Sequence, residues 1–143
     1  MPEPERIMRE FFECVWNQAD ATAIARFFPE TSRTFGILPD PDEAMLGSGP
    51  FEQFHASILR LVSNPNAEVM HVVSQGDEAI SVVRFRADQN DKPGERVDFC
   101  FAAWAKVKDG VVVEARNVID FQTFLVQLGK ADPAALPKAL GLS

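Results

Sequence analysis

The chain has 143 residues and a net charge of −7, with 46% hydrophobic and 24% charged residues, the composition of an ordinary globular protein. This length is enough for one domain with its own core, so we expect a single domain over residues 1–143. The acidic balance argues against a nucleic-acid partner, and no apolar run reaches the roughly 20 residues that a membrane helix needs.

The cellular compartment is predicted from the N-terminus and the cysteines. The first residues are charged and lack the apolar core of a signal peptide, and Cys14 and Cys100 are too few for a disulfide framework. We therefore expect a cytoplasmic protein. Cys100 lies among aromatic residues, which predicts an inert buried thiol. The two histidines lie far apart in the sequence and no cysteine pair is present, so no metal site is expected.

The aromatic composition is unusual, with twelve Phe, two Trp and no Tyr. A high phenylalanine content suits either an apolar pocket or a phenylalanine-rich core, and the composition alone does not choose between them. The absence of tyrosine is more decisive. Any mechanism that needs a phenol as a hydrogen-bond donor is excluded.

Three helices are predicted in the N-terminal half. Residues 4–18 carry apolar side chains at helical spacing, and Asp20 is a preferred N-cap for a second helix that ends at Pro29. An exposed, acidic, turn-rich loop follows. A third helix begins at Pro50 and ends at residues 63–66.

The sequence pattern then changes to that of strands. Runs rich in β-branched and aromatic residues, joined by short turns and one longer loop, predict an antiparallel meander over residues 67–74, 79–88, 96–107 and 111–121. A last helix is predicted over residues 122–129, and residues 131–143 form a tail with a short helix.

Both phases of the predicted strand 96–107 are largely apolar, unlike a sheet with one face in water. We therefore expect helices of the chain on one face and a second copy of the chain on the other, which makes the protein a homodimer through its sheet.

Four segments carry a resemblance to a known family: "VWNQADATAIARFF", "GSGPFEQF", "VKDGVVVEARNVID" and "FLVQLG". In this order and spacing the chain resembles the nuclear transport factor 2-like superfamily, and within it the SnoaL-like polyketide cyclase branch. The resemblance implies an α+β, cystatin-like cone, in which helices pack in the concavity of a strongly curved, mostly antiparallel sheet. It also implies an apolar pocket and no cofactor.

The same superfamily includes polyketide cyclases, ketosteroid isomerases, epoxide hydrolases and dehydratases, together with non-enzymatic binding and assembly domains. A fold with so many uses does not name a substrate. Without tyrosine, this chain cannot form the oxyanion hole of ketosteroid isomerase.

Asp120 is the first candidate for a catalytic residue. The resemblance implies that the aspartate at this point of the last strand is a general acid or base. A carboxyl group between apolar walls has a raised pKa and can remove a proton next to a carbonyl. The alternative is structural, because an Asp directly before a helix is a preferred N-cap.

Arg116 is the second catalytic candidate. It shares the strand phase of Asp120 and could keep that carboxylate ionised or bind an oxyanion; the alternative is an ion pair with Glu114. Asn117 has the opposite phase and reaches the same pocket only if a bulge intervenes.

Other residues are candidates for the wall or mouth of the pocket: Trp16, Phe35, His55, His71, Asp98, Phe101 and Trp104. Asp98 is either a second carboxylate of the site or a solvated residue. Trp104 either donates its indole N–H to a ligand or lies in the core or dimer interface. Trp16 and Phe35 equally suit the core, and both histidines are expected as core residues with satisfied hydrogen bonds.

Three functions remain open on the sequence alone. The first is a cofactor-independent enzyme that uses Asp120 for proton transfer on a hydrophobic, carbonyl-bearing small molecule, in a cyclisation, isomerisation or hydration. The second is a module that binds a hydrophobic small molecule without chemistry. The third is an assembly domain whose pocket is filled by its own phenylalanines.

Overall fold

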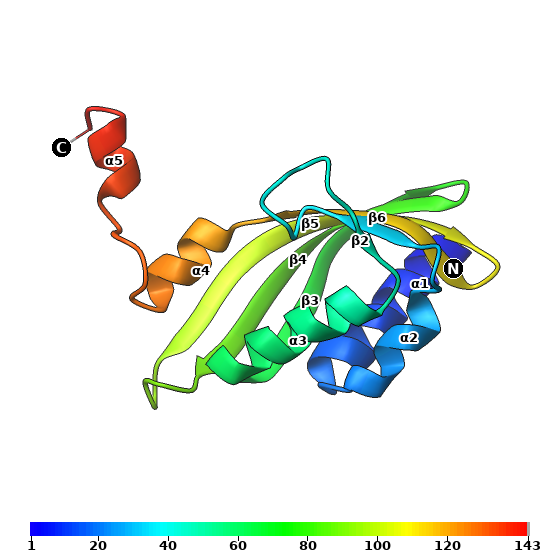
Figure 1. Ribbon diagram of the computed structural model, residues 1–143, viewed down its shortest axis with the longest axis horizontal. Coiled ribbons are helices and arrows are strands. Elements are labelled where there is room, and N and C mark those ends of the chain that lie inside the picture. The colour runs from blue at the N-terminus through cyan, green and yellow to red at the C-terminus, as the bar shows by residue number, and fades with distance from the viewer. Residues whose placement is uncertain (143) are drawn as a thin grey trace.

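The computed structural model describes residues 1–142. One curved, six-stranded sheet in the order β2–β1–β6–β5–β4–β3 forms the body of the molecule (Figure 1). Its strands are β1 (Arg33–Phe35), β2 (Met45–Leu46), β3 (Val62–Gln75), β4 (Glu78–Gln89), β5 (Arg96–Lys108) and β6 (Val111–Ile119). Only β1 and β6 pair in parallel. The predicted α+β class and the predicted meander are confirmed.

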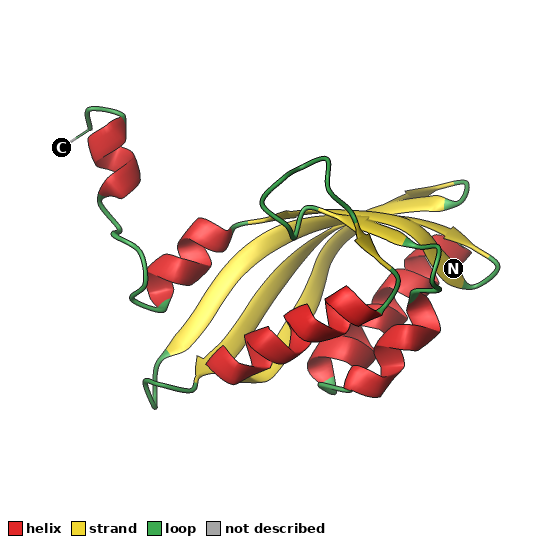
Figure 2. Ribbon diagram, viewed as in Figure 1, coloured by secondary structure: helices red, strands yellow, loops and turns green. Residues whose placement is uncertain are grey.

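The helices of residues 1–61 gather on the concave face of this sheet (Figure 2). In residues 1–142 the helices are α1 (Glu3–Phe11), the π-helix η1 (Phe12–Asn17), the 3₁₀ turn η2 (Ala21–Ala23), α2 (Ile24–Phe27), α3 (Gly49–Leu61), α4 (Phe121–Gln127) and α5 (Ala135–Ala139). α4 lies at the end of the sheet, and α5 projects from the body and buries none of its residues. No helix in residues 1–142 is both long and apolar enough to cross a membrane.

The π-helix η1 joins the N-terminal helix to the rest of the fold. Its wider turn leaves the carbonyl of Val15 outside the helix ladder, where it accepts a hydrogen bond from Nε2 of His55 on α3 at 2.7 Å. The side chain of Asn17 pairs with the backbone of Ala67 on β3, accepting from its N–H at 2.6 Å and donating to its carbonyl at 3.3 Å. These contacts fix the helix on both sides.

The third helix ends at Leu61, close to the expected end at residues 63–66, but these residues already belong to a strand. β3 begins at Val62, immediately after α3, and it crosses this segment through a bulge between Ser63 and Asn66. Asn64 takes a positive φ of 50° and donates a hydrogen bond to Asp88 of β4 at 2.9 Å. Since the bulge has no ladder pair here, Pro65 fits into the strand without losing a hydrogen bond.

The core lies between the helices and the concave face and is rich in phenylalanine. Phe11 makes edge-to-face contacts with four other rings, at centroid distances of 5.4–5.6 Å. These partners are Phe12, Phe27, Phe28 and Phe51. Such edge-to-face pairs add to the stabilisation from apolar burial.

Candidate functional site

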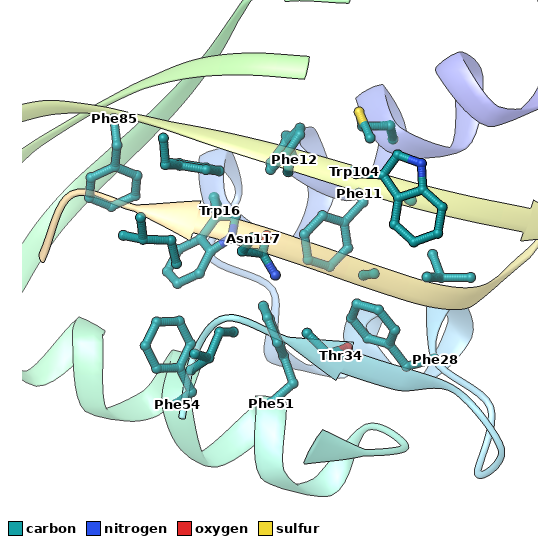
Figure 3. Close-up of a pocket in the computed structure, with 18 of the residues that line it drawn as sticks. Phe11, Phe12, Trp16, Phe28, Thr34, Phe51, Phe54, Phe85, Trp104 and Asn117 are labelled. Carbon is teal, nitrogen blue, oxygen red and sulfur yellow. The ribbon is translucent and has the colours of Figure 1, made fainter. Parts of the chain in front are cut away.

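An apolar cavity of about 90 Å³ lies between the helices and the concave face of the sheet. Aromatic side chains from α1, η1, α3, β5 and α4 make up much of its wall (Figure 3). Within residues 1–142, no Asp, Glu, His, Lys, Arg or Cys lines this cavity. Its polar side chains among the described residues are Thr34 of β1 and Asn117 of β6, together with the indoles of Trp16 and Trp104. The cavity therefore offers hydrogen bonds but no charge.

A bulge decides which residues of β6 face the cavity. β5 pairs Lys106 with Glu114 and then Val107 with Val112, so Val113 is the extra residue. Beyond this bulge, the inward positions of β6 are Ala115, Asn117 and Ile119. This bulge lies before both Arg116 and Asn117, so the two keep opposite phases, and it is the phase of Asn117 that lines the cavity.

Arg116 points to the opposite, convex face. Its guanidinium lies over the ring of Phe35 at 4.1 Å and pairs with Glu114 at 3.4 Å. Neither Arg116 nor Phe35 is among the residues that line the cavity. The ion pair with Glu114 that was the structural alternative for Arg116 is therefore the contact observed.

Asp120 caps α4. Its carboxylate accepts hydrogen bonds from the backbone N–H of Thr123 at 3.0 Å and from the hydroxyl of Thr123 at 2.6 Å. The hydroxyl bond, and then the backbone bond, lower the pKa of Asp120 below its usual value. The side chain is exposed and does not line the cavity. A lowered pKa suits a charged cap better than a base.

Asn117 is held in place by β1. Its Nδ2 donates to the carbonyl of Phe35 at 3.2 Å. The strands meet closely because Gly36, at φ 90°, passes against the backbone of Asn117, and a Cβ at this position would overlap the Asn117 carbonyl oxygen. Gly36 is therefore required by both its φ and its space.

Thr34 is a polar residue of the cavity that the sequence did not single out. The side chain is buried, and its hydroxyl has no hydrogen-bond partner in the described part of the chain. An unpaired buried hydroxyl costs about 1–3 kcal/mol. The three-residue strand β1 carries too little alternation for its inward face to be predicted.

Trp16 lines the cavity and rests on His55, with ring centroids 4.7 Å apart. His55 is buried, and since its Nε2 donates to Val15, its proton lies on Nε2. Nδ1 has no partner among the described residues, so the expected satisfied core histidine is confirmed for burial but not for full hydrogen bonding. The expectation of a core residue is wrong for His71, because a bulge between Val69 and His71 turns it to the solvent.

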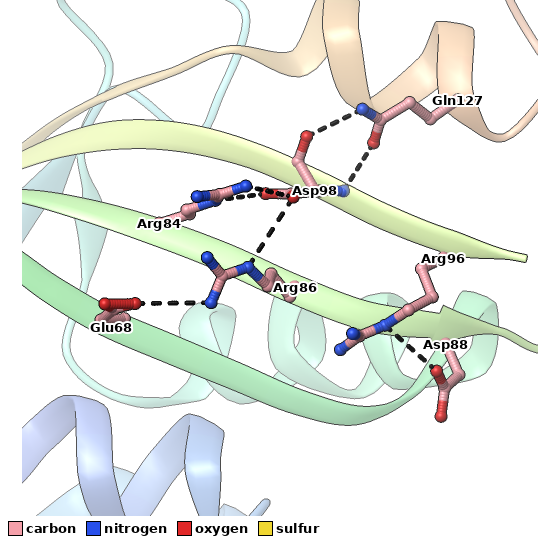
Figure 4. Close-up of polar contacts among 7 residues, drawn as sticks. All are labelled: Glu68, Arg84, Arg86, Asp88, Arg96, Asp98 and Gln127. Carbon is pink, nitrogen blue, oxygen red and sulfur yellow. Dashed lines mark hydrogen bonds and ion pairs between the residues drawn. The ribbon is translucent and has the colours of Figure 1, made fainter.

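Asp98 belongs to a charged cluster on the convex face (Figure 4). Arg84 holds it by two hydrogen bonds of 2.7 and 2.6 Å, and Arg86 lies 3.7 Å away. The hydrogen bond from Arg84 lowers the pKa of Asp98. Asp98 is thus not a second carboxylate of the cavity. Cys100 lies on the same face and is exposed, so the expected buried thiol is wrong.

Phe101 and Trp104 of β5 are both in contact with the cavity. Phe101 has the inward phase and packs against Phe12, with centroids 5.9 Å apart. Trp104 has the phase of the convex face, and its indole N–H donates to Glu78 of β4 at 3.1 Å. Its N–H is therefore used within the sheet.

The family of the chain is shown by comparison with known proteins. A family model described as the SnoaL-like domain matches residues 8–115. The chain belongs to the SnoaL-like family. The match ends just before Arg116, so family membership assigns no role to the polar groups at residues 116–120.

Solved structures share the SnoaL-like fold of this chain. One is AclR from Streptomyces galilaeus, for which a hydroxylase function has been proposed, at 22% identity and TM-score 0.77, covering 96% of this chain and 93% of AclR. Another is IdmH from Streptomyces antibioticus, a proposed polyketide cyclase, at 18% identity and TM-score 0.75, covering 90% of this chain and 99% of IdmH. At these identities they establish the fold alone. No curated protein sequence gives a significant match.

The C-terminal part of this SnoaL-like chain closes one end of the cavity. Phe121 and Phe124 of α4 line it, and Gln127 ties the helix to β5. The Gln127 side chain donates to the carbonyl of Asp98 and accepts from its N–H, both at 2.8 Å, as a neighbouring strand would. Gln89 adds a hydrogen bond of 3.0 Å to the carbonyl of Gln127. The Gln of the sequence "FLVQLG" thus has a structural role that the sequence did not reveal.

Proposed function

We propose that this SnoaL-like protein binds a small hydrophobic molecule in the cavity, without a cofactor and without acid–base chemistry by the residues that line it. The observation that carries this proposal is the lining itself, which is apolar and aromatic and has no side chain that could take up or release a proton in residues 1–142. A concave apolar site with a few convergent polar groups is typical of ligand binding.

The volume limits the size of the ligand. An apolar cavity of about 150 Å³ binds benzene, so a cavity of about 90 Å³ limits the ligand to about one small ring. For so small a ligand we expect a dissociation constant of about 0.1–1 mM.

Binding of p-xylene, followed by ligand-detected NMR, tests the proposal. Ala103→Leu should abolish binding, since Ala103 lines the cavity and three added carbon atoms would fill much of it. Ala102→Leu is the matched control, because Ala102 is the preceding residue on β5 and has the convex phase. Failure of the wild-type protein to bind, or equal binding by both variants, would contradict the proposal.

Catalysis by Asp120 is the second candidate, and one observation favours it. Asp120 lies between Ile119 and Phe121, which both line the cavity, so it is adjacent in sequence to two residues of the wall. This candidate requires a substrate whose turnover is lost in Asp120→Asn while its affinity is unchanged. Turnover that survives Asp120→Asn would remove Asp120 from the mechanism.

A further inference from the structure

We infer that the ligand is a neutral ring compound with a hydroxyl group, and that Asn117, Thr34 and Trp16 recognise this hydroxyl. The inference rests on the proposed binding function and adds the chemical class of the ligand. It follows from the donors and acceptors of the cavity wall that have no hydrogen-bond partner among the described residues.

Asn117 supplies a free acceptor. Its amide orientation is fixed, because Nδ2 donates to the carbonyl of Phe35 at 3.2 Å and the reversed amide would place two oxygens against each other. Oδ1 is then left as an acceptor, and none of the described residues donates to it. A ligand satisfies this oxygen only with an O–H or N–H group.

Two donors accompany this acceptor. The indole N–H of Trp16, on the cavity wall, donates to no described residue, and the hydroxyl of Thr34 has no partner. Thr34 lies beside Ala115 in the β1–β6 register, two positions before Asn117 on the same inward face. The Thr34 oxygen is shielded in its present rotamer, so contact with a ligand requires a rotation about χ1.

The combination selects a neutral group that both donates and accepts, as a hydroxyl does, over a carbonyl or a charged group. A hydroxyl donates to Asn117 Oδ1 and accepts from Trp16 or Thr34, whereas a carbonyl would leave Asn117 Oδ1 unpaired. A carboxylate or an alkylammonium group would be buried with no opposite charge in the wall, because no charged side chain lines the cavity in residues 1–142. Phenols and small alicyclic alcohols meet all of these requirements.

Three probes of similar shape test the inference: p-cresol, p-xylene and 4-methylbenzoate. In the wild-type protein we expect p-cresol and p-xylene to bind and 4-methylbenzoate not to bind. Thr34→Val keeps the shape of the side chain and removes its hydroxyl, so it should weaken p-cresol about five- to tenfold and leave p-xylene unchanged. Thr34→Ser should restore the preference for p-cresol.

The indole N–H proton of Trp16, observed by NMR in the wild-type protein, gives a second readout that needs no variant. We expect p-cresol to shift this signal more strongly than p-xylene does. Equal shifts, equal loss of both ligands in Thr34→Val, or binding of 4-methylbenzoate would overturn the inference while leaving apolar binding intact. If neither p-xylene nor p-cresol binds, the proposed function itself fails.

Discussion

At the scale of single residues, Asp120, the first catalytic candidate of the sequence, lies outside the cavity, whereas Asn117 lines it. The sequence offered an N-cap as the alternative to a catalytic role for Asp120, and the cap is the contact that the structure shows. It did not settle that Asn117, rather than Arg116, faces the cavity. The three consecutive valines at residues 111–113 carry no alternation that would reveal the bulge at Val113.

The cap should contribute measurably to stability. Asp120→Ala should lower the free energy of unfolding by about 1 kcal/mol at pH 7, because it removes both hydrogen bonds to Thr123. Asp132→Ala is the control, since Asp132 accepts a hydrogen bond from the Ala134 N–H just before α5, a helix that buries nothing. Urea unfolding of the three proteins gives the comparison, and equal losses in the two variants would contradict it.

The contribution of Asp120 should also depend on pH in a defined direction. Its pKa in the folded protein is below the unfolded value of about 3.9, so its stabilisation is complete above that pH and is lost as pH falls through the folded pKa. The stability difference between the wild type and Asp120→Ala should therefore shrink when unfolding is measured at progressively lower pH below 4. A difference that grows on acidification would show that Asp120 is not a charged cap.

At the scale of elements, long segments with a clear period were predictable and short ones were not. The three N-terminal helices, the four long strands and the helix that ends in "FLVQLG" all lie close to their expected places. The two-residue strand β2 and the direct passage from α3 into β3 were missed. Their pairing depends on partners distant in sequence, such as Arg33 opposite Leu46, and on a bulge that places Pro65 within a strand.

The attachment of α4 through Gln127 is the element-scale contact that most affects the site. Gln127→Leu should lower the free energy of unfolding by about 1–3 kcal/mol, because both backbone groups of Asp98 lose their partner. Hydrogen exchange at the Asp98 amide should become faster. Gln122→Leu, on the exposed side of the same helix, should change neither quantity. Slow exchange at Asp98 in Gln127→Leu would show that another group protects it.

At the scale of the whole molecule, the convex face of the sheet has no helical cover in the described chain, and it is partly apolar. Exposed side chains on it include Ile80, Val82 and Val118, of which Val118 is 76% exposed. In the register, Val82 lies opposite Ala102, and Ala102 opposite Val118, so the apolar side chains form a row across three strands. A continuous apolar patch of this kind commonly marks an interface.

We propose that a second copy of the chain covers this face, as the apolar phases of the sequence suggested. Sedimentation velocity at about 10 µM should give a dimer for the wild type and a monomer for Val118→Lys, which places a charge at the most exposed residue of the row. Leu136→Lys, on the exposed helix α5 that projects from the body, should remain a dimer. A wild-type protein that sediments as a monomer would end this proposal.

The way Gln127 holds α4 against β5 also bears on any attempt to widen the cavity by shortening the chain. Residues 96–100 of β5 pair with β4 alone, because the pairing with β6 starts only at Phe101. On the edge of this segment that β6 does not reach, Gln127 of α4 pairs with the backbone of Asp98. A chain truncated after Asp120 would expose an unpaired strand edge, to which a strand of another molecule can add. We expect such a protein to aggregate. Replacing phenylalanines of the wall with smaller residues is therefore the better way to admit larger ligands.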